Sequence, residues 1–122
     1  MADYFPPEYS PEAVRDDFVP KGDFLDRRFH ELEKEHLWPR AWQIACRLDE
    51  IPGPGDYIVY EIVDDSIVVV RGADGEVRAF HNVCPHRGTL LAEGKGNARQ
   101  FVCPFHGWRF DTGGRCIKVI DR

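Results

Sequence analysis

The chain has 122 residues, of which 43% are apolar and 30% charged, and its formal net charge is −5 at pH 7. This is the composition of a globular protein, and the length fits one domain better than a two-domain enzyme with a separate substrate pocket. The acidic balance, without a long Lys/Arg run, argues against a nucleic-acid partner. The longest apolar stretch, residues 67–70, is far shorter than the ~20 residues that span a bilayer, so no membrane partner is expected.

The first 40 residues are predicted to form an N-terminal arm followed by one amphipathic α-helix. Four prolines within residues 1–22 argue against regular structure there, because proline fixes φ and lacks an N–H donor. This N-terminus also lacks the apolar core of a signal peptide, which favours a cytoplasmic location. Over residues 23–37, Asp23 or Asp26 is placed to cap a helix of about three turns, and Pro39 to end it. The predicted inner face of this helix consists of Phe29, Leu32, His36 and Leu37.

From residue 41 the pattern acquires a period of two, which predicts an all-β domain over residues 41–122. Trp42, Ile44 and Cys46 alternate with Gln, Ala and Arg, as on the buried face of a half-buried strand. Further along, turns rich in Gly, Pro and Asp separate short β-branched runs, so the fold class is mainly β with antiparallel strands. Strands are predicted at residues 57–63, 67–71, 76–80, 100–102, 109–111 and 116–120, with turns at 51–56, 64–65, 73–75 and 112–114.

Two of the four cysteines lie in similar short loops that also hold a histidine. Residues 84–88 read Cys-Pro-His-Arg-Gly, and residues 103–108 read Cys-Pro-Phe-His-Gly-Trp. Thiolate and imidazole together suit zinc, copper or an iron–sulfur centre. The spacing differs from zinc-finger knuckles and from the four-thiolate ferredoxins, whereas two Cys and two His form the set that holds a [2Fe–2S] cluster with two imidazoles on one iron. A structural Cys2His2 zinc site is the alternative interpretation.

The remaining cysteines and histidines are given structural roles. Cys46 is expected to be a small buried hydrophobic residue and Cys116 to be structural as well, and a reducing cytoplasm argues against a disulfide between them. His30 and His36 are expected to be surface or packing residues of the helix. His81 either lies close to the metal ligands or serves for packing or capping.

The spacing Cys84-x-His86-x16-Cys103-x2-His106 is the Rieske [2Fe–2S] motif. Together with the Phe-His-Asn-Val segment before the first loop and the Trp-Arg-Phe-Asp segment after the second, the sequence resembles the N-terminal part of the large (α) subunit of Rieske non-haem iron ring-hydroxylating oxygenases. The resemblance extends from roughly residue 28 to the end of the chain. It implies a Rieske-type antiparallel β-sandwich with a two-loop cluster-binding subdomain.

The resemblance also assigns the ligands. It implies that Cys84 and Cys103 hold the inner iron, that His86 and His106 hold the outer iron, and that each imidazole leaves its other N–H at the protein tip. Four flanking residues are expected around these ligands: Arg87, Gly88, Gly107 and Trp108.

The expected reduction potential follows from a second comparison. Respiratory-chain Rieske proteins carry two hydroxyl side chains where this chain has Trp108 and Phe110, and an extra loop cysteine where it has Phe105. Because fewer donors face the sulfurs, we expect a potential at the low end of the Rieske range.

The resemblance implies a role in a longer electron path. Electrons pass from a reductase or ferredoxin to the cluster, and then to a mononuclear Fe(II) in a C-terminal catalytic domain of the same or a neighbouring subunit of a homo- or hetero-oligomer. No histidine follows His106, and the sequence ends just after a predicted strand, so we expect that domain to be absent and no catalytic residue to be present.

Two other functions compete with this interpretation. One is a free-standing Rieske-type ferredoxin, against which the 40 residues before the β domain argue. The other is a zinc-binding interaction module, which would be colourless where an iron–sulfur protein is red-brown.

Overall fold

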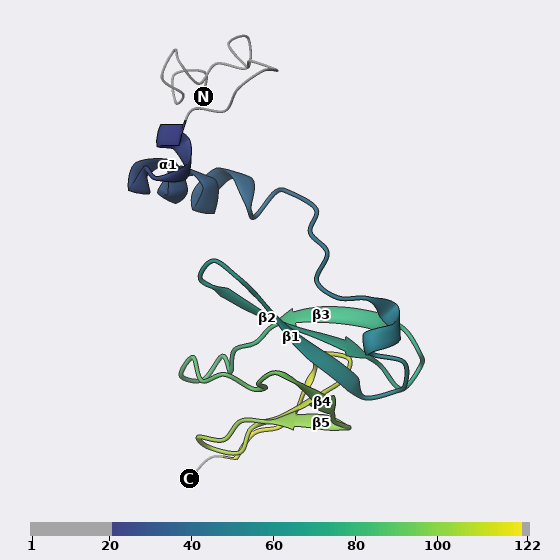
Figure 1. Ribbon diagram of the computed structural model, residues 1–122. Coiled ribbons are helices and arrows are strands. Elements are labelled where there is room, and N and C mark those ends of the chain that lie inside the picture. Colours follow the sequence, from purple (N-terminus) through teal and green to yellow (C-terminus); the bar gives the residue numbers. More distant parts are fainter. Residues whose placement is uncertain (1–20, 121–122) are drawn as a thin grey trace. The chain divides into compact units, whose positions relative to one another are not determined.

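The computed structural model describes residues 21–120, and the chain divides into two compact units, Met1–Arg40 and Ala41–Arg122 (Figure 1). The predicted proline-rich arm lies almost wholly outside the described residues. The two units differ in secondary structure: the first is helical in its described part, and the second is built mainly from strands.

The described part of the first unit is helical and contains a 3-10 helix, an α-helix and a π-helix in succession. A 3-10 helix, η4 (Lys21–Phe24), precedes α1 (Arg27–Leu32), which runs on as a π-helix, η5 (Glu33–Leu37). Of the two predicted caps Asp26 is the one used, since its Oδ1 accepts a hydrogen bond of 2.8 Å from Arg28 N. The predicted helix is therefore present but starts later, and its end is widened by a bond from Trp38 N to Glu33 O.

The larger sheet of the second unit contains four antiparallel strands in the order β3-β2-β1-β4. The central pair, β1 and β2, carries the β-branched runs that predicted it, and β2 buries three successive valines. The strands are β1 (Asp56–Ile62), β2 (Asp65–Arg71), β3 (Val77–His81) and β4 (Lys95–Asn97).

The smaller sheet contains three short antiparallel strands in the order β5-β6-β7. They are β5 (Gln100–Val102), β6 (Arg109–Asp111) and β7 (Cys116–Lys118). Gly114 has a φ of +85° in the turn before β7, as the predicted Gly-Gly turn requires. The turn at Gly75, with a φ of +84°, is likewise where the sequence predicts it.

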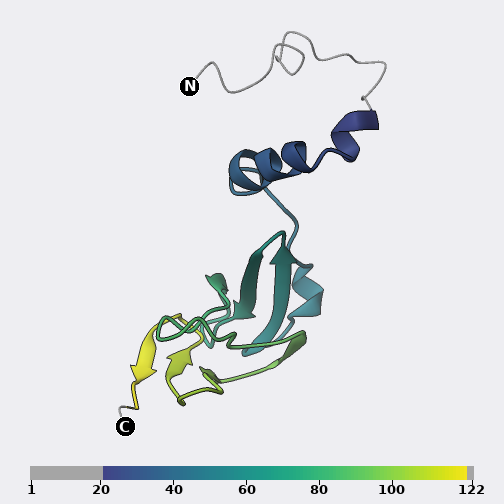
Figure 2. The same ribbon diagram turned by 90° about the vertical axis from the view of Figure 1, so that its left-hand side faces the viewer.

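One apolar core joins the two sheets. It contains Val68 and Val70 of β2, Phe101 of β5 and Phe110 of β6, and the side chains of Cys84 and Cys103 complete it. Figure 1 shows β5 below the larger sheet, and Figure 2 shows the separation of the sheets from the side. The predicted fold class, mainly β with antiparallel sheets and a short helix, is confirmed.

The predicted strand at the start of the second unit is wrong. Residues 41–47 form no strand, and Trp42 and Ile44 are exposed, whereas Gln43 and Ala45 are half-buried. The alternation does not define one buried face, because Gln43 and Ala45 are half-buried but so is Cys46, which belongs to the predicted face. Gln43 is held by another segment, since its Oε1 accepts a hydrogen bond of 2.6 Å from the Tyr60 hydroxyl.

The strand β4 was not predicted, because its sequence, Lys-Gly-Asn, has no apolar alternation. It pairs with β1 through backbone register, with Gly96 opposite Tyr57. A Cβ at Gly96 would lie 2.9 Å from the Tyr57 hydroxyl oxygen, so glycine is needed for the close approach.

The turn between β1 and β2 lies one residue earlier than predicted. Ile62 pairs with Asp65, which leaves Val63 and Asp64 as the two turn residues. Val63 has a φ of +54°, a region where a β-branched side chain is strained. The aspartates suggested the turn chemistry, but the register of the valine-rich strand set its position.

Replacing Val63 by glycine is expected to stabilise the protein. The substitution removes the left-handed strain of about 1 kcal/mol, which corresponds to a rise in Tm of roughly 4 °C. Thermal unfolding followed by circular dichroism measures the change. Val77→Gly is the matched control, since Val77 is similarly exposed but lies in β3, where glycine should lower Tm. Equal losses in both variants would contradict strain at Val63.

Candidate metal centre

Two loops of nearly identical backbone geometry carry the predicted ligands. The first loop, residues 84–89, follows β3, and the second loop, residues 103–108, connects β5 to β6. In the first, Cys84 N donates to Thr89 O at 2.8 Å and Gly88 N to Cys84 O at 2.9 Å.

The second loop repeats both bonds at the same lengths, from Cys103 N to Trp108 O and from Gly107 N to Cys103 O. Gly88 and Gly107 each have a φ of +74°, which explains the glycine that follows each histidine. Two of the predicted flanking residues thus serve to close the loops.

The two loops bring their cysteine sulfurs together inside the core. Cys84 and Cys103 are 1% and 2% exposed, and both belong to the same cluster of buried core residues. Burial raises the pKa of Cys84, although the amides of His86 and Arg87 act against it.

For Cys103, the hydrogen bonds outweigh burial in their effect on the pKa. Burial also acts to raise its pKa, but hydrogen bonds from the backbone amides of Phe105 and His106, with others from side chains, lower it overall. In both loops, amides that follow the cysteine therefore point at its sulfur, as a site for negatively charged sulfur requires.

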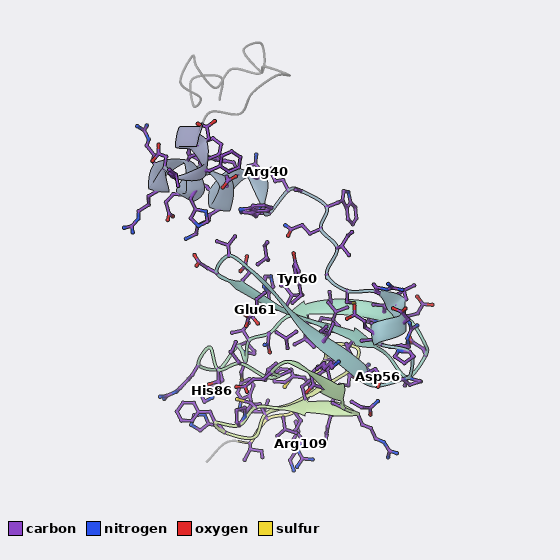
Figure 3. The ribbon with its side chains drawn as sticks, viewed as in Figure 1. Arg40, Asp56, Tyr60, Glu61, His86 and Arg109 are labelled. Atoms are coloured by element: carbon purple, nitrogen blue, oxygen red, sulfur yellow. The ribbon has the colours of Figure 1, made fainter. Side chains whose placement is uncertain are left out.

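The two imidazoles lie side by side on the outside. His86 and His106 are exposed, and their ring centroids are 4.6 Å apart. The pKa of His106 is lowered, first by desolvation and then by the positive charges of His86 and Arg87. Trp108 stacks on His86 with ring planes 2° apart and centroids 5.0 Å apart. Figure 3 shows His86 at the margin of the β domain.

The candidate metal-binding groups are thus arranged as an inner pair of thiols and an outer pair of imidazoles. Within residues 21–120, no group of three or more His, Cys, Asp or Glu side chains is arranged to hold a single metal ion. A [2Fe–2S] cluster needs two protein ligands on each iron, and the buried pair of thiols and the exposed pair of imidazoles would provide that number. The residues present therefore fit this group.

Asn82, which the sequence analysis did not identify as functional, anchors the first loop. Its side chain is 1% exposed and makes four hydrogen bonds. The amide nitrogen donates to Ser66 Oγ at 3.0 Å and to Ala92 O at 2.8 Å, and Oδ1 accepts from the backbone nitrogens of Leu91 and Ala92 at 2.9 Å. Both flanks of the loop are thereby tied to β2. The sequence carried no signal for this role beyond an Asn two residues before a ligand.

The other predicted residues differ in their surroundings. All four cysteines are free; Cys46 is half-buried with a pKa raised by burial and by Glu50, and Cys116 is exposed on β7, so it does not contribute to the core. His81 ends β3 opposite Ile67 and is exposed, as is Arg87. Of the flanking residues, Trp108 makes a direct ring contact with His86.

Comparison with known proteins agrees with this geometry. The family model for the Rieske [2Fe-2S] domain matches residues 41–121. The chain is 40% identical over 97 residues to the carnitine monooxygenase oxygenase subunit of Escherichia coli (strain K12), which covers 79% of this chain and 26% of that protein. It is 37% identical over 97 residues to the biphenyl 2,3-dioxygenase subunit alpha of Rhodococcus jostii (strain RHA1), with 79% and 21% covered.

A solved structure shows the same fold. The apo form of a quaternary ammonium Rieske monooxygenase matches with a TM-score of 0.79 and 36% sequence identity, over 84% of this chain and 30% of that one. The matched protein is a Rieske oxygenase, and the two sheets and the twin loops of this chain are the fold of a Rieske domain.

The chain belongs to the Rieske [2Fe-2S] domain family, and its cofactor is a Rieske-type [2Fe–2S] cluster. The relatives are oxygenase subunits and hence oxidoreductases, so the resemblance to oxygenase α subunits is confirmed. The chain spans about a quarter of the length of these curated relatives. No helix described within residues 21–120 is long and apolar enough to cross a membrane.

Removing the Asn82 side chain is expected to destabilise the protein strongly. Asn82→Ala leaves half-buried backbone groups of residues 91 and 92 without their present partner, at a cost of about 2 kcal/mol in the free energy of unfolding. Chemical denaturation of the cluster-loaded protein measures it. The matched control is Asn97→Ala, because Asn97 also bonds a carbonyl and a side chain but is exposed. Equal losses in the free energy of unfolding at the two sites would show that the hydrogen bonds of buried Asn82 stabilise the protein no more than those of exposed Asn97.

Proposed function

We propose that Cys84, His86, Cys103 and His106 hold the [2Fe–2S] cluster and that the chain transfers electrons within the α subunit of a Rieske oxygenase. The observation that carries this is the pairing in the twin loops, with two buried thiols inside and two exposed imidazoles outside. When bound, such a cluster accepts and releases one electron at a time.

The thiols and the imidazoles have different roles on the two sides of the site. The thiols of Cys84 and Cys103 lie in the apolar core, where loop amides offset the charge of their deprotonated forms. The rings of His86 and His106 lie in contact with solvent, so they are the part of the site that a partner can reach. This arrangement, with the thiols inside and the imidazoles at the surface, supports electron entry and exit at the imidazole edge.

The proposed partners follow from the relatives. A reductase or ferredoxin supplies the electron, and a mononuclear iron in a catalytic domain of the same or a neighbouring subunit receives it, within an oligomer. The relatives described above are subunits of oxygenases, which favours this role over a free-standing ferredoxin. An open reading frame that continues past the last residue into a His-x4-His segment would support it further, and a stop codon beside a reductase gene would favour the carrier.

The ligand assignment predicts a selective loss of colour. His86→Ala and Cys103→Ala should abolish cluster binding, and with it much of the folding stability, because metal binding is linked to folding. Iron and sulfide content, the visible spectrum and the EPR spectrum of the reduced protein report the loss.

The matched controls are Cys46→Ala and His81→Ala, which remove the same side-chain types outside the twin loops. Both should retain the cluster and the EPR signature of a His-ligated centre. A Cys46→Ala protein without colour would show that the ligand set is wrong. A colourless wild-type protein that holds zinc would overturn the proposed function.

The reduction potential is expected at the low end of the Rieske range of about −150 to +300 mV. The positions that carry hydroxyls in respiratory-chain Rieske proteins hold Trp108, which stacks on His86, and Phe110, which is buried in the core. Neither side chain has a hydroxyl to donate to sulfur, so the reduced state is expected to gain less stabilisation. Redox titration of the loaded protein measures this, and a potential above that of the standard hydrogen electrode would contradict it.

A further inference from the structure

The charges of the second unit are divided along the chain. Residues 41–83, which include β1, β2 and β3, contain eight acidic and three basic side chains. Residues 84–120, which include both loops and the smaller sheet, contain two acidic and six basic side chains. Although the chain as a whole has a formal net charge of −5, the part that carries the proposed metal ligands is therefore positively charged.

Most of this positive charge is not neutralised within the chain. In residues 41–83, Arg47 and Arg78 each form an ion pair with a nearby aspartate, at 2.7 and 2.6 Å. In residues 84–120, Arg115 pairs with Asp111 at 3.1 Å. Five further basic side chains form no ion pair with any residue that the structure describes: Arg87, Lys95, Arg99, Arg109 and Lys118.

Two of these unpaired cations lie in one row across the smaller sheet, at the base of the second loop. Val102, Arg109 and Lys118 are partners in register on β5, β6 and β7. Their neighbours Phe101 and Phe110 belong to the core, so the row points to the other side of the sheet, away from the core. Val102 and Lys118 are exposed, and Arg109 Nε has no hydrogen-bond partner among the described residues.

This row continues into the two imidazoles. Trp108, which directly precedes Arg109, stacks on His86. Phe105 is 57% exposed, and its ring centroid lies 4.0 Å from that of His106. An exposed cation also directly follows the first of these histidines in the chain. Together these side chains form a basic face, which consists of Arg87, Val102, Phe105, Arg109 and Lys118.

We infer that the basic face is the docking surface of an acidic electron-donor protein, whose carboxylates contact the cations while the imidazole edge receives the electron. The inference rests on the proposed function and adds the chemical character of the partner. Apolar and aromatic side chains set among cations are the composition of a protein–protein interface, where aromatic residues and arginine are enriched.

The unpaired charges indicate a partner that binds and leaves. Permanent interfaces are more apolar, so a catalytic domain or a second copy that covered this face permanently would bury cations without partners. A transient electron-transfer partner buries less surface and is steered by charge, which suits exposed cations at the edge of a redox site. A nucleic acid, by contrast, is long enough to meet the acidic side chains of residues 41–83 as well.

The test is the rate at which a reduced plant-type [2Fe–2S] ferredoxin of net negative charge reduces the cluster-loaded chain in a stopped-flow experiment. One electron passes, so one ferrous ion of the donor becomes ferric and one ferric ion of the chain becomes ferrous. The transfer is favourable, because plant-type ferredoxins have lower potentials than Rieske centres.

Salt separates the charge of the basic face from the charge of the whole chain. We expect the second-order rate constant to fall about tenfold between ~0.01 M and ~1 M salt, as the Debye length shortens from about 30 Å to about 3 Å. The net charge of −5 predicts the opposite, because two negatively charged proteins repel each other less when salt is added.

Lys118→Glu is expected to lower the rate constant about threefold at ~0.1 M salt, where the Debye length of about 10 Å limits the effect to nearby charges. The matched control is Lys95→Glu, an equally large change of charge at an exposed position of β4. Lys95 pairs with Ile58, whose neighbours Tyr57 and Val59 pack against the core, so Lys95 faces away from the core on the other sheet. Its rate constant should equal that of wild type.

A rate constant that rises with salt or does not change, or equal effects of Lys118→Glu and Lys95→Glu, would overturn the inference. Salt-sensitive self-association of the loaded chain in sedimentation would assign the face to a second copy and overturn it as well, as would binding of duplex DNA that Lys118→Glu abolishes. If Lys118→Glu does not assemble the cluster, Lys118→Gln takes its place, with a smaller decrease expected and Lys95→Gln as its control.

The wild-type spectrum separates this inference from the proposed function. A wild-type protein without the EPR signature of a His-ligated [2Fe–2S] centre would overturn the function itself. A normal signature together with a rate constant that does not fall with salt would overturn only the docking surface.

Discussion

The burial of the Cys84 and Cys103 thiols in one apolar core is the constraint on which the rest of the second unit depends. As the proposed metal ligands, these sulfurs must be deprotonated, yet they lie almost without exposure among valine and phenylalanine side chains. Burial opposes the charge on both, and only amides aimed at the sulfurs and a bound cation can offset it. Both loops therefore adopt one backbone geometry, with a left-handed glycine at its end.

The two sheets hold these loops in register. The second loop needs little support, because β5 and β6 flank it directly as a hairpin. The first loop has a sheet strand on one side only, and its far side runs through residues 90–94 before β4 begins. The Asn82 amide replaces the missing strand there by bonding the backbone of residues 91 and 92. A buried polar group at this point follows from the asymmetry of the two loops.

The sequence was sufficient where local chemistry decides the structure, and insufficient where a distant partner decides it. Gly75 and Gly114 mark their turns because the turn itself requires a positive φ. In contrast, Gln43 is held by a hydrogen bond from the hydroxyl of Tyr60, which lies on β1, 17 residues further along the chain. The strand β4 exists because β1 offers it a free edge, and nothing in Lys-Gly-Asn indicates this.

The same division applies to the metal centre. The four proposed ligands are recognisable because thiolate and imidazole at that spacing have few other uses. Asn82 is an ordinary residue whose role arises from contacts across the fold, with the backbone amides of residues 91 and 92. Nothing in its sequence neighbourhood indicates these bonds, because the two segments meet only when the chain folds.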